Sequence, residues 1–86
     1  MRKKHRKTLD DITTTPVKAN IVWRDIESLL IALGAEIKEG SGSRVRIKLN
    51  DVWAVFHRPY PQKETDKGAV KAMREFLEKA GVYKDE

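Results

Sequence analysis

The sequence predicts an α+β domain of two layers, in which a three-stranded antiparallel sheet carries two helices on one face. Three observations predict it: a helical pattern of apolar residues over about 23–33, alternating patterns within 44–57, and a second helical pattern before Gly81. The predicted element order is therefore helix, three strands, helix, or αβββα. Because a chain of 86 residues can close one modest core and no more, these elements belong to a single domain.

The first helix is predicted from four apolar residues at the spacing i, i+3, i+4 and i+7. They are Ile26, Leu29, Leu30 and Leu33. Asp25 and Glu27 lie near the start, where the helix dipole favours acidic side chains. Gly34 follows the last apolar position and can adopt the left-handed conformation that ends a helix. We therefore expect the helix over about 23–33.

Three strands are predicted in the middle of the chain. Residues 35–39 lead into a flexible turn at 40–43, and apolar and basic residues then alternate over 44–49. This alternation is typical of a strand with one buried and one exposed face. Asn50 and Asp51 are expected to form a short turn into a third strand that ends at His57.

The chain then passes through a predicted loop into the second helix. Residues 58–67 are expected to form the loop, because their two prolines cannot donate hydrogen bonds to a strand ladder. Helical spacing returns at Val70, Met73, Leu77 and Ala80, and Gly81 marks the end. Double-stranded-RNA-binding domains resemble this αβββα layout, although a shared fold does not assign a function.

The two ends of the chain are expected to lie outside this domain. Residues 1–20 show no helical or strand periodicity and are predicted to form a basic, extended or disordered arm, with the domain over 21–83 and a tail over 84–86. The segment 1–7 carries five basic residues and no acid, so the rest of the chain balances to zero net charge. Such an arm is attracted to phosphate backbones, or it is a solvated tail, and both interpretations stay open.

Composition excludes several classes of function. Cysteine is absent, which excludes disulfides and thiolate metal sites and fits the cytoplasm. No apolar stretch predicts a signal peptide or a membrane span. No cluster of His, Asp and Glu has the spacing of metal ligands, and no glycine motif for nucleotides occurs. We therefore expect no metal, no small-molecule cofactor and no membrane partner.

The predicted hairpin sorts its side chains onto two faces. A two-residue turn at Asn50 and Asp51 pairs Arg44 with His57 and Lys48 with Trp53. The inner face then holds only apolar residues, which supports this register, since a one-residue slip would bury charges. The outer face holds Arg44, Arg46, Lys48, Trp53, Val55 and His57.

This outer face has the chemistry that single-stranded nucleic acid requires. Arg44, Arg46 and Lys48 can hold phosphates, and Trp53 offers a plane for base stacking. Two other interpretations stay open: an ordinary solvated sheet face, or a protein interface centred on Trp53.

Two histidines could exchange protons near neutral pH. His57 would lie opposite Arg44 and could deprotonate an RNA 2′-hydroxyl while an arginine stabilises the charge on phosphorus. A lone histidine at a strand end is more often structural. His5 lies in the predicted arm and is expected to add to its positive charge.

Four segments of the chain stand out by their order and spacing. They are Trp23-Arg24-Asp25-Ile26 with Leu29-Leu30 and Leu33-Gly34, Gly42-Ser43-Arg44-Val45-Arg46-Ile47, Val55-Phe56-His57-Arg58-Pro59, and Lys67-Gly68-Ala69-Val70. Together they resemble the HicA toxins of bacterial toxin–antitoxin systems. The resemblance implies an αβββα fold, metal-independent endoribonuclease activity on mRNA that blocks translation, and inhibition by a HicB-like antitoxin protein.

The chain departs from the family at one position. Many HicA proteins have Gly-Ser-His, with a catalytic histidine, where this chain has Gly42-Ser43-Arg44. Arginine stays protonated and cannot act as a general base, although it can clamp a phosphate. His57 is therefore the candidate general base, and Arg58, which follows it, is expected to join the RNA-binding residues. The alternative is a non-catalytic module that binds RNA or sequesters an antitoxin.

Overall fold

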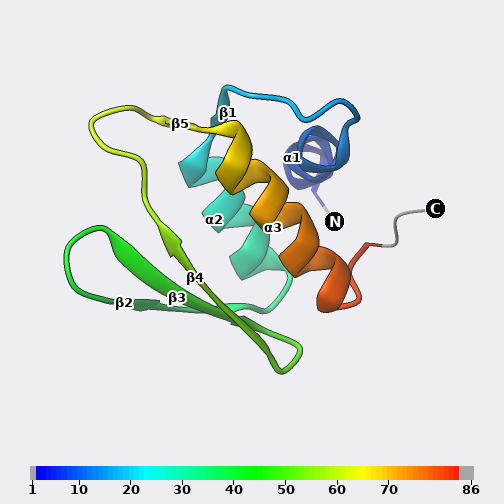
Figure 1. The fold of residues 1–86 in the computed structure, drawn as a ribbon. Helices are drawn as coiled ribbons and strands as arrows, with labels where there is room; N and C mark the ends of the chain where they lie inside the picture. Colours follow the sequence, from blue (N-terminus) through cyan, green and yellow to red (C-terminus); the bar gives the residue numbers. More distant parts are fainter. Residues whose placement is uncertain (1, 84–86) are drawn as a thin grey trace.

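The computed structural model describes residues 2–83 of the chain. Its elements are α1 (Lys3–Thr13), β1 (Ile21–Val22), α2 (Trp23–Ala32), β2 (Glu36–Glu39), β3 (Arg44–Leu49), β4 (Val52–His57), β5 (Glu64–Thr65) and α3 (Lys67–Lys79). An antiparallel sheet in the order β2-β3-β4 is covered on one face by α2 and α3 (Figure 1). The predicted αβββα fold class is confirmed. The expected tail at 84–86 lies outside the described residues.

The β3–β4 hairpin has the register that the sequence predicts. Arg44 pairs with His57, Lys48 with Trp53 and Leu49 with Val52. Asn50 and Asp51 both have positive φ, at 49° and 67°, which suits a tight two-residue hairpin turn. The Asn50 Nδ2 atom also donates to the carbonyl oxygen of Ala80 at 2.9 Å, so the turn is fastened to the end of α3.

The core lies between the sheet and the two helices that cover it. The inward-facing residues of β3 are at most 2% exposed, and they pack against apolar residues of α2 and α3. Three aromatic rings join the layers: Phe56 of β4 lies 6.0 Å from Trp23 and 5.9 Å from Phe76, measured between ring centroids. Burial of these rings stabilises the contact of one strand with both helices.

Both predicted helix ends are confirmed. Gly34 and Gly81 follow α2 and α3 with φ of 93° and 80°, in the left-handed region that favours glycine. At the start of α3 the Asp66 carboxylate accepts a hydrogen bond from the backbone N–H of Ala69 at 2.8 Å. This is a side-chain cap, which satisfies one of the free donors in the first turn.

The expectation of an extended or disordered arm over 1–20 is wrong for α1. Its inward side is formed by His5, Thr8, Leu9 and Ile12, at helical spacing. Because two of these four residues are polar, the apolar periodicity of the segment is too weak to be recognised. Thr8 is nevertheless 5% exposed and Ile12 fully buried, and α1 contacts α2, α3 and β1 (Figure 1).

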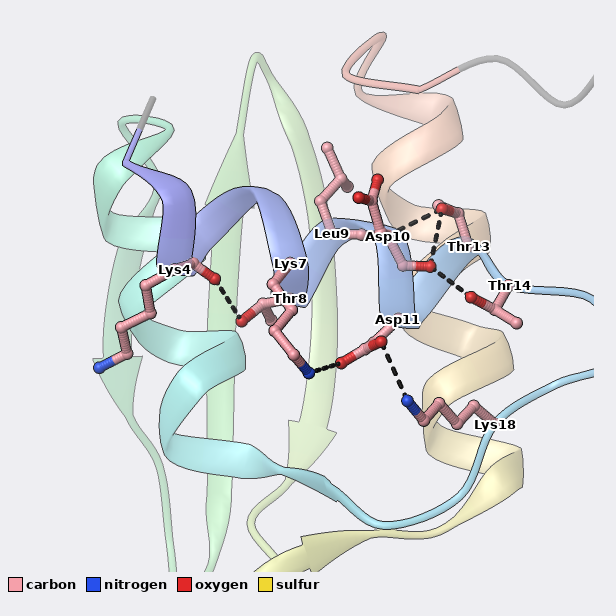
Figure 2. A network of polar contacts seen from close by, with 9 residues as sticks. All are labelled: Lys4, Lys7, Thr8, Leu9, Asp10, Asp11, Thr13, Thr14 and Lys18. Carbon is pink, nitrogen blue, oxygen red and sulfur yellow. Dashed lines mark hydrogen bonds and ion pairs between the residues drawn. The ribbon is translucent and has the colours of Figure 1, made fainter.

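Polar contacts hold the far end of α1 in place. The guanidinium of Arg74 on α3 donates to the carbonyl oxygens of Ile12 at 3.2 Å and Thr14 at 2.6 Å, which would otherwise lack partners at a helix end. Asp11 accepts from Lys7 at 3.2 Å and from Lys18 at 3.1 Å (Figure 2). The helix and the segment that follows it are thus tied to one another and to α3.

A second correction concerns the predicted loop at 58–67. Two of its residues form β5, which pairs antiparallel with β1 in a small sheet of their own. The backbone N–H of Trp23 also donates to the carbonyl oxygen of Lys63 at 3.0 Å. Strands of two residues carry no periodicity, so the sequence could not indicate this pairing.

Candidate nucleic-acid interface

The outer face of the sheet carries the side chains that the sequence assigned to it. Arg44, Arg46 and His57 are exposed, Lys48 is half-buried, and Trp53 and Val55 are 49% and 54% exposed. The register places them on two adjacent strands, opposite the face that contacts the helices. This part of the predicted site is therefore brought together on one surface.

Trp53 lies beside two of the cations. The Cζ atom of Arg46 is 5.8 Å from the centroid of the indole ring and the Nζ atom of Lys48 is 5.5 Å from it. Such contacts are worth about 0.5–1 kcal/mol each at exposed sites. They hold both cations next to an aromatic plane, an arrangement in which a base can stack while its phosphates meet positive charge.

The neighbouring strand β2 adds a cation that sequence reasoning missed. Lys38 lies directly opposite Arg46, and like charges in that position destabilise a sheet. A hollow of about 420 Å³ lies at the β2–β3 turn, and its charged lining consists of Lys38, Arg44, Arg46 and Glu39. A short alternation within 36–39 is the signal that could have found it, since Lys38 follows the half-buried Ile37. An anionic ligand in the hollow would relieve the repulsion.

His57 and Arg44 form the end of this surface. They are paired across β4 and β3, and the turn before Arg44 is closed by a hydrogen bond from Gly40 N to Arg44 O at 2.8 Å. In the described part of the chain the His57 imidazole makes no hydrogen bond or ion pair. Its ring nitrogens are therefore not engaged by another described residue.

Arg58 differs from the other predicted RNA-binding residues, because two carboxylates already hold it. Its Nε and Nη2 atoms donate to Glu27 of α2 at 2.7 and 3.1 Å, and its Nη1 atom donates to Glu39 of β2 at 2.6 Å. Glu27 also accepts from the Trp23 indole N–H. The guanidinium thus joins α2, β2 and the end of β4, and its donors are engaged within the protein.

The same contacts shift two pKa values. The hydrogen bonds to Glu27 and Glu39 hold the pKa of Arg58 above its ordinary value. The hydrogen bond from Arg58 lowers the pKa of Glu39 below its ordinary 4.5. Both shifts favour the charged forms, so this ion-pair cluster persists across the neutral range.

Over residues 2–83 no group of three or more His, Asp or Glu side chains is placed to hold a metal ion. Within the same residues no helix has both the length and the apolar content needed to cross a membrane.

Comparison with known proteins identifies the family. A family model described as the HicA toxin of bacterial toxin-antitoxin matches residues 23–82, which is well over half of the chain. The chain belongs to the HicA toxin family. No curated protein and no solved structure gives a significant match.

The HicA match extends from the first residue of α2 to the end of α3, so it covers the αβββα fold. It includes the whole outer face of the sheet, with Arg44 and His57. The helix α1 and the segment up to Val22 lie before it. The protein is thus a HicA-family toxin of a toxin–antitoxin system, and it carries an additional N-terminal helix.

Proposed function

We propose that this HicA toxin binds single-stranded mRNA on the outer face of its sheet and cleaves it, without a metal ion, to block translation in the cytoplasm. One observation carries the proposal. The His57 side chain makes no hydrogen bond or ion pair with another described residue, and His57 lies directly opposite Arg44 on the neighbouring strand. The cations Lys38, Arg46 and Lys48 lie on the same face of the sheet. A proton acceptor and a cluster of phosphate-binding groups on one exposed surface are what RNA cleavage requires.

The proposed chemistry is transfer of the phosphodiester to the neighbouring 2′-hydroxyl. His57 takes the proton of that hydroxyl, and the 2′-oxygen attacks the adjacent phosphorus. The bond from phosphorus to the 5′-oxygen then breaks, and the leaving oxygen takes a proton from the imidazolium or from water. Arg44, which lies opposite His57, stabilises the negative charge that builds up on the phosphoryl oxygens. The products are a 2′,3′-cyclic phosphate and a 5′-hydroxyl.

The remaining side chains would hold the RNA. Arg46 and Lys48 meet its phosphates, and Trp53 beside them stacks on a base. The partner that regulates the toxin is proposed to be a HicB-like antitoxin with an acidic surface, which would cover the same cations and the exposed Trp53.

The test is expression of the toxin in bacteria that lack the antitoxin, together with incubation of the purified protein with unmodified RNA. We expect growth arrest by the wild type, and relief of arrest with a loss of cleavage of about 100-fold or more by His57→Ala. His5→Ala serves as the matched control, because it removes the chain's second histidine, which lies on α1. This variant should remain toxic. Equal cleavage by His57→Ala and the wild type would exclude His57 as the base.

A second candidate function is a non-catalytic module that binds RNA or sequesters its antitoxin. The observation that favours it is Arg44 at the position where many HicA proteins have a histidine. Under this alternative the purified protein shifts RNA on a gel, with a steep dependence on salt, yet leaves the RNA intact after long incubation.

A further inference from the structure

A second basic hollow lies beside α1, away from the outer face of the sheet. It measures about 590 Å³, and its walls come from α1, the start of α2 and the chain after β4. Its charged lining consists of four cations and one carboxylate: Lys4, Arg24, Arg58, Lys63 and Asp25. We call it the basic groove.

The cations of the basic groove are not equally available. Arg58 is held by two carboxylates, and the Nζ atom of Lys4 lies 3.7 Å from the Asp25 carboxylate. By contrast, the side chains of Arg24 and Lys63 are exposed, and neither makes a hydrogen bond or ion pair with another described residue. Two unneutralised positive charges therefore face this groove.

The fold brings these two cations to the same groove, although they are 39 positions apart in the sequence. The β1–β5 pairing aligns Val22 with Glu64, and the backbone N–H of Trp23 donates to the carbonyl oxygen of Lys63 at 3.0 Å. Arg24 and Lys63 therefore stand next to a fixed backbone junction. A rigid backbone beneath two long cationic side chains limits the entropy lost when a ligand orders them.

A neighbouring hollow lies between the basic groove and the turn that precedes the proposed cleavage surface. This hollow of about 620 Å³ shares Arg58 and Pro59 with the basic groove and reaches Gly42 and Ser43 in the β2–β3 turn. The residue after Ser43 is Arg44, on the outer face. Tyr60 also lines this hollow and is 90% exposed. A path thus runs from His57 and Arg44 past a free aromatic ring to the basic groove.

We propose that the basic groove holds phosphates of the same RNA strand beyond the cleavage point, and that Tyr60 stacks on a base between the two sites. The inference rests on the proposed function and extends it to substrate length. Guanidinium, ammonium and exposed aromatic groups along one path match single-stranded nucleic acid. One wall, with Lys4, belongs to α1 and lies outside the family match, so this contact is a feature of the additional helix.

The experiment compares binding of two 2′-O-methyl RNA probes, which lack the attacking hydroxyl, of about 4 and about 16 nucleotides. Fluorescence anisotropy is recorded over a range of salt concentrations for the wild type and for Arg24→Gln/Lys63→Gln. We expect the double variant to bind the longer probe about tenfold more weakly, with a salt slope reduced by about 1.4 for two lost phosphate contacts. Affinity for the shorter probe, which the outer face can hold alone, should change about twofold or less.

A control with the same loss of charge is Lys71→Gln/Lys79→Gln, since both lysines are exposed on α3 and line neither hollow. It should retain the affinity of the wild type for the longer probe. Tyr60→Leu should weaken binding of that probe about fivefold or more, whereas Tyr60→Phe, which keeps the ring, should not.

Each failure has its own meaning. If the wild type cleaves unmodified RNA but binds both probes equally well, or if the control variant loses as much affinity as the groove variant, the inference is wrong and the proposed function stands. If the wild type binds no RNA, both are wrong. If the groove variant keeps its RNA affinity but binds the antitoxin less well, the groove is a protein surface and the inference is wrong.

Discussion

At the scale of single residues, Arg58 shows how one side chain can organise the rim of a site. It follows His57 directly, yet its guanidinium turns to Glu27 and Glu39 instead of the outer face. The Glu27 side chain is only 18% exposed and bonds through both carboxylate oxygens, a paired geometry that arginine forms and lysine cannot. We therefore assign Arg58 to holding the ends of β2 and β4 against α2.

Substitution of Arg58 should reveal this structural role. Arg58→Ala leaves the largely buried Glu27 carboxylate without a cation, so the free energy of unfolding should fall by about 2 kcal/mol, between the values for exposed and buried pairs. Arg58→Lys keeps the charge but loses the paired geometry and should cost about 1 kcal/mol. Urea denaturation measures both. If Arg58→Ala keeps the stability of the wild type but binds RNA more weakly, the structural assignment is wrong and Arg58 is an RNA-binding residue.

At the scale of elements, α1 is stabilised by its tertiary contacts and not by its own sequence. It has no side-chain cap at its start, and its outward side is strongly basic. An isolated helix of 11 residues is marginal in water. Ile12 in the core and Arg74 at its last carbonyls supply the stabilisation that the local sequence lacks.

Loss of the buried contact should therefore destabilise the protein measurably. Ile12→Ala removes a fully buried side chain and should lower the free energy of unfolding by about 2–4 kcal/mol. Ile31→Ala makes the same chemical change at a position that is 63% exposed, and it should cost less than about 1 kcal/mol. Chemical denaturation of the two variants tests this. Equal stability losses would mean that α1 does not pack on the core.

At the scale of the whole molecule, free positive charge gathers on two neighbouring surfaces. The outer face of the sheet and the basic groove both carry free cations. Near them Asp25, Glu27 and Glu39 are engaged in ion pairs. Glu36, directly opposite Lys48, makes no ion pair with another described residue. Asp11 is another engaged carboxylate: burial raises its pKa, but hydrogen bonds from Lys18 and Lys7 outweigh this, and the pKa lies below its ordinary 3.8. An ion pair removes one charge of each sign, so the net charge is unchanged and the unpaired cations are the ones left to meet a ligand.

The lowered pKa values of Asp11 and Glu39 predict a loss of stability in acid. Both carboxylates bind protons less readily in the folded state than in the unfolded state. Their contribution to the free energy of unfolding is therefore complete above their ordinary pKa values, and it is lost as the pH falls through their lower pKa values in the folded protein. Asp11→Asn should lower Tm by about 2–4 °C near neutral pH, the effect of an exposed ion pair of about 0.5 kcal/mol in a chain of this size. The difference from the wild type should vanish at strongly acidic pH. A constant difference across the range would contradict the ion-pair explanation.

The sequence by itself determined the αβββα order, the helix ends at Gly34 and Gly81, and the register of the β3–β4 hairpin. The physical reason is that each of these depends on local chemistry. Glycine permits positive φ where a helix stops, and the Asn50-Asp51 turn admits one register that buries only apolar residues. The placement of Arg44 opposite His57 follows from that register.

Only the tertiary structure decided which cations are free and which elements form without periodicity. Arg58 and Glu27 are 31 positions apart, and nothing in either segment indicates their pairing. The same holds for Lys38 opposite Arg46, for the β1–β5 junction beneath Arg24 and Lys63, and for α1, whose inward side is half polar. These features arise from contacts between distant segments, because the neutralisation of a charge or the burial of a threonine depends on what the fold brings beside it.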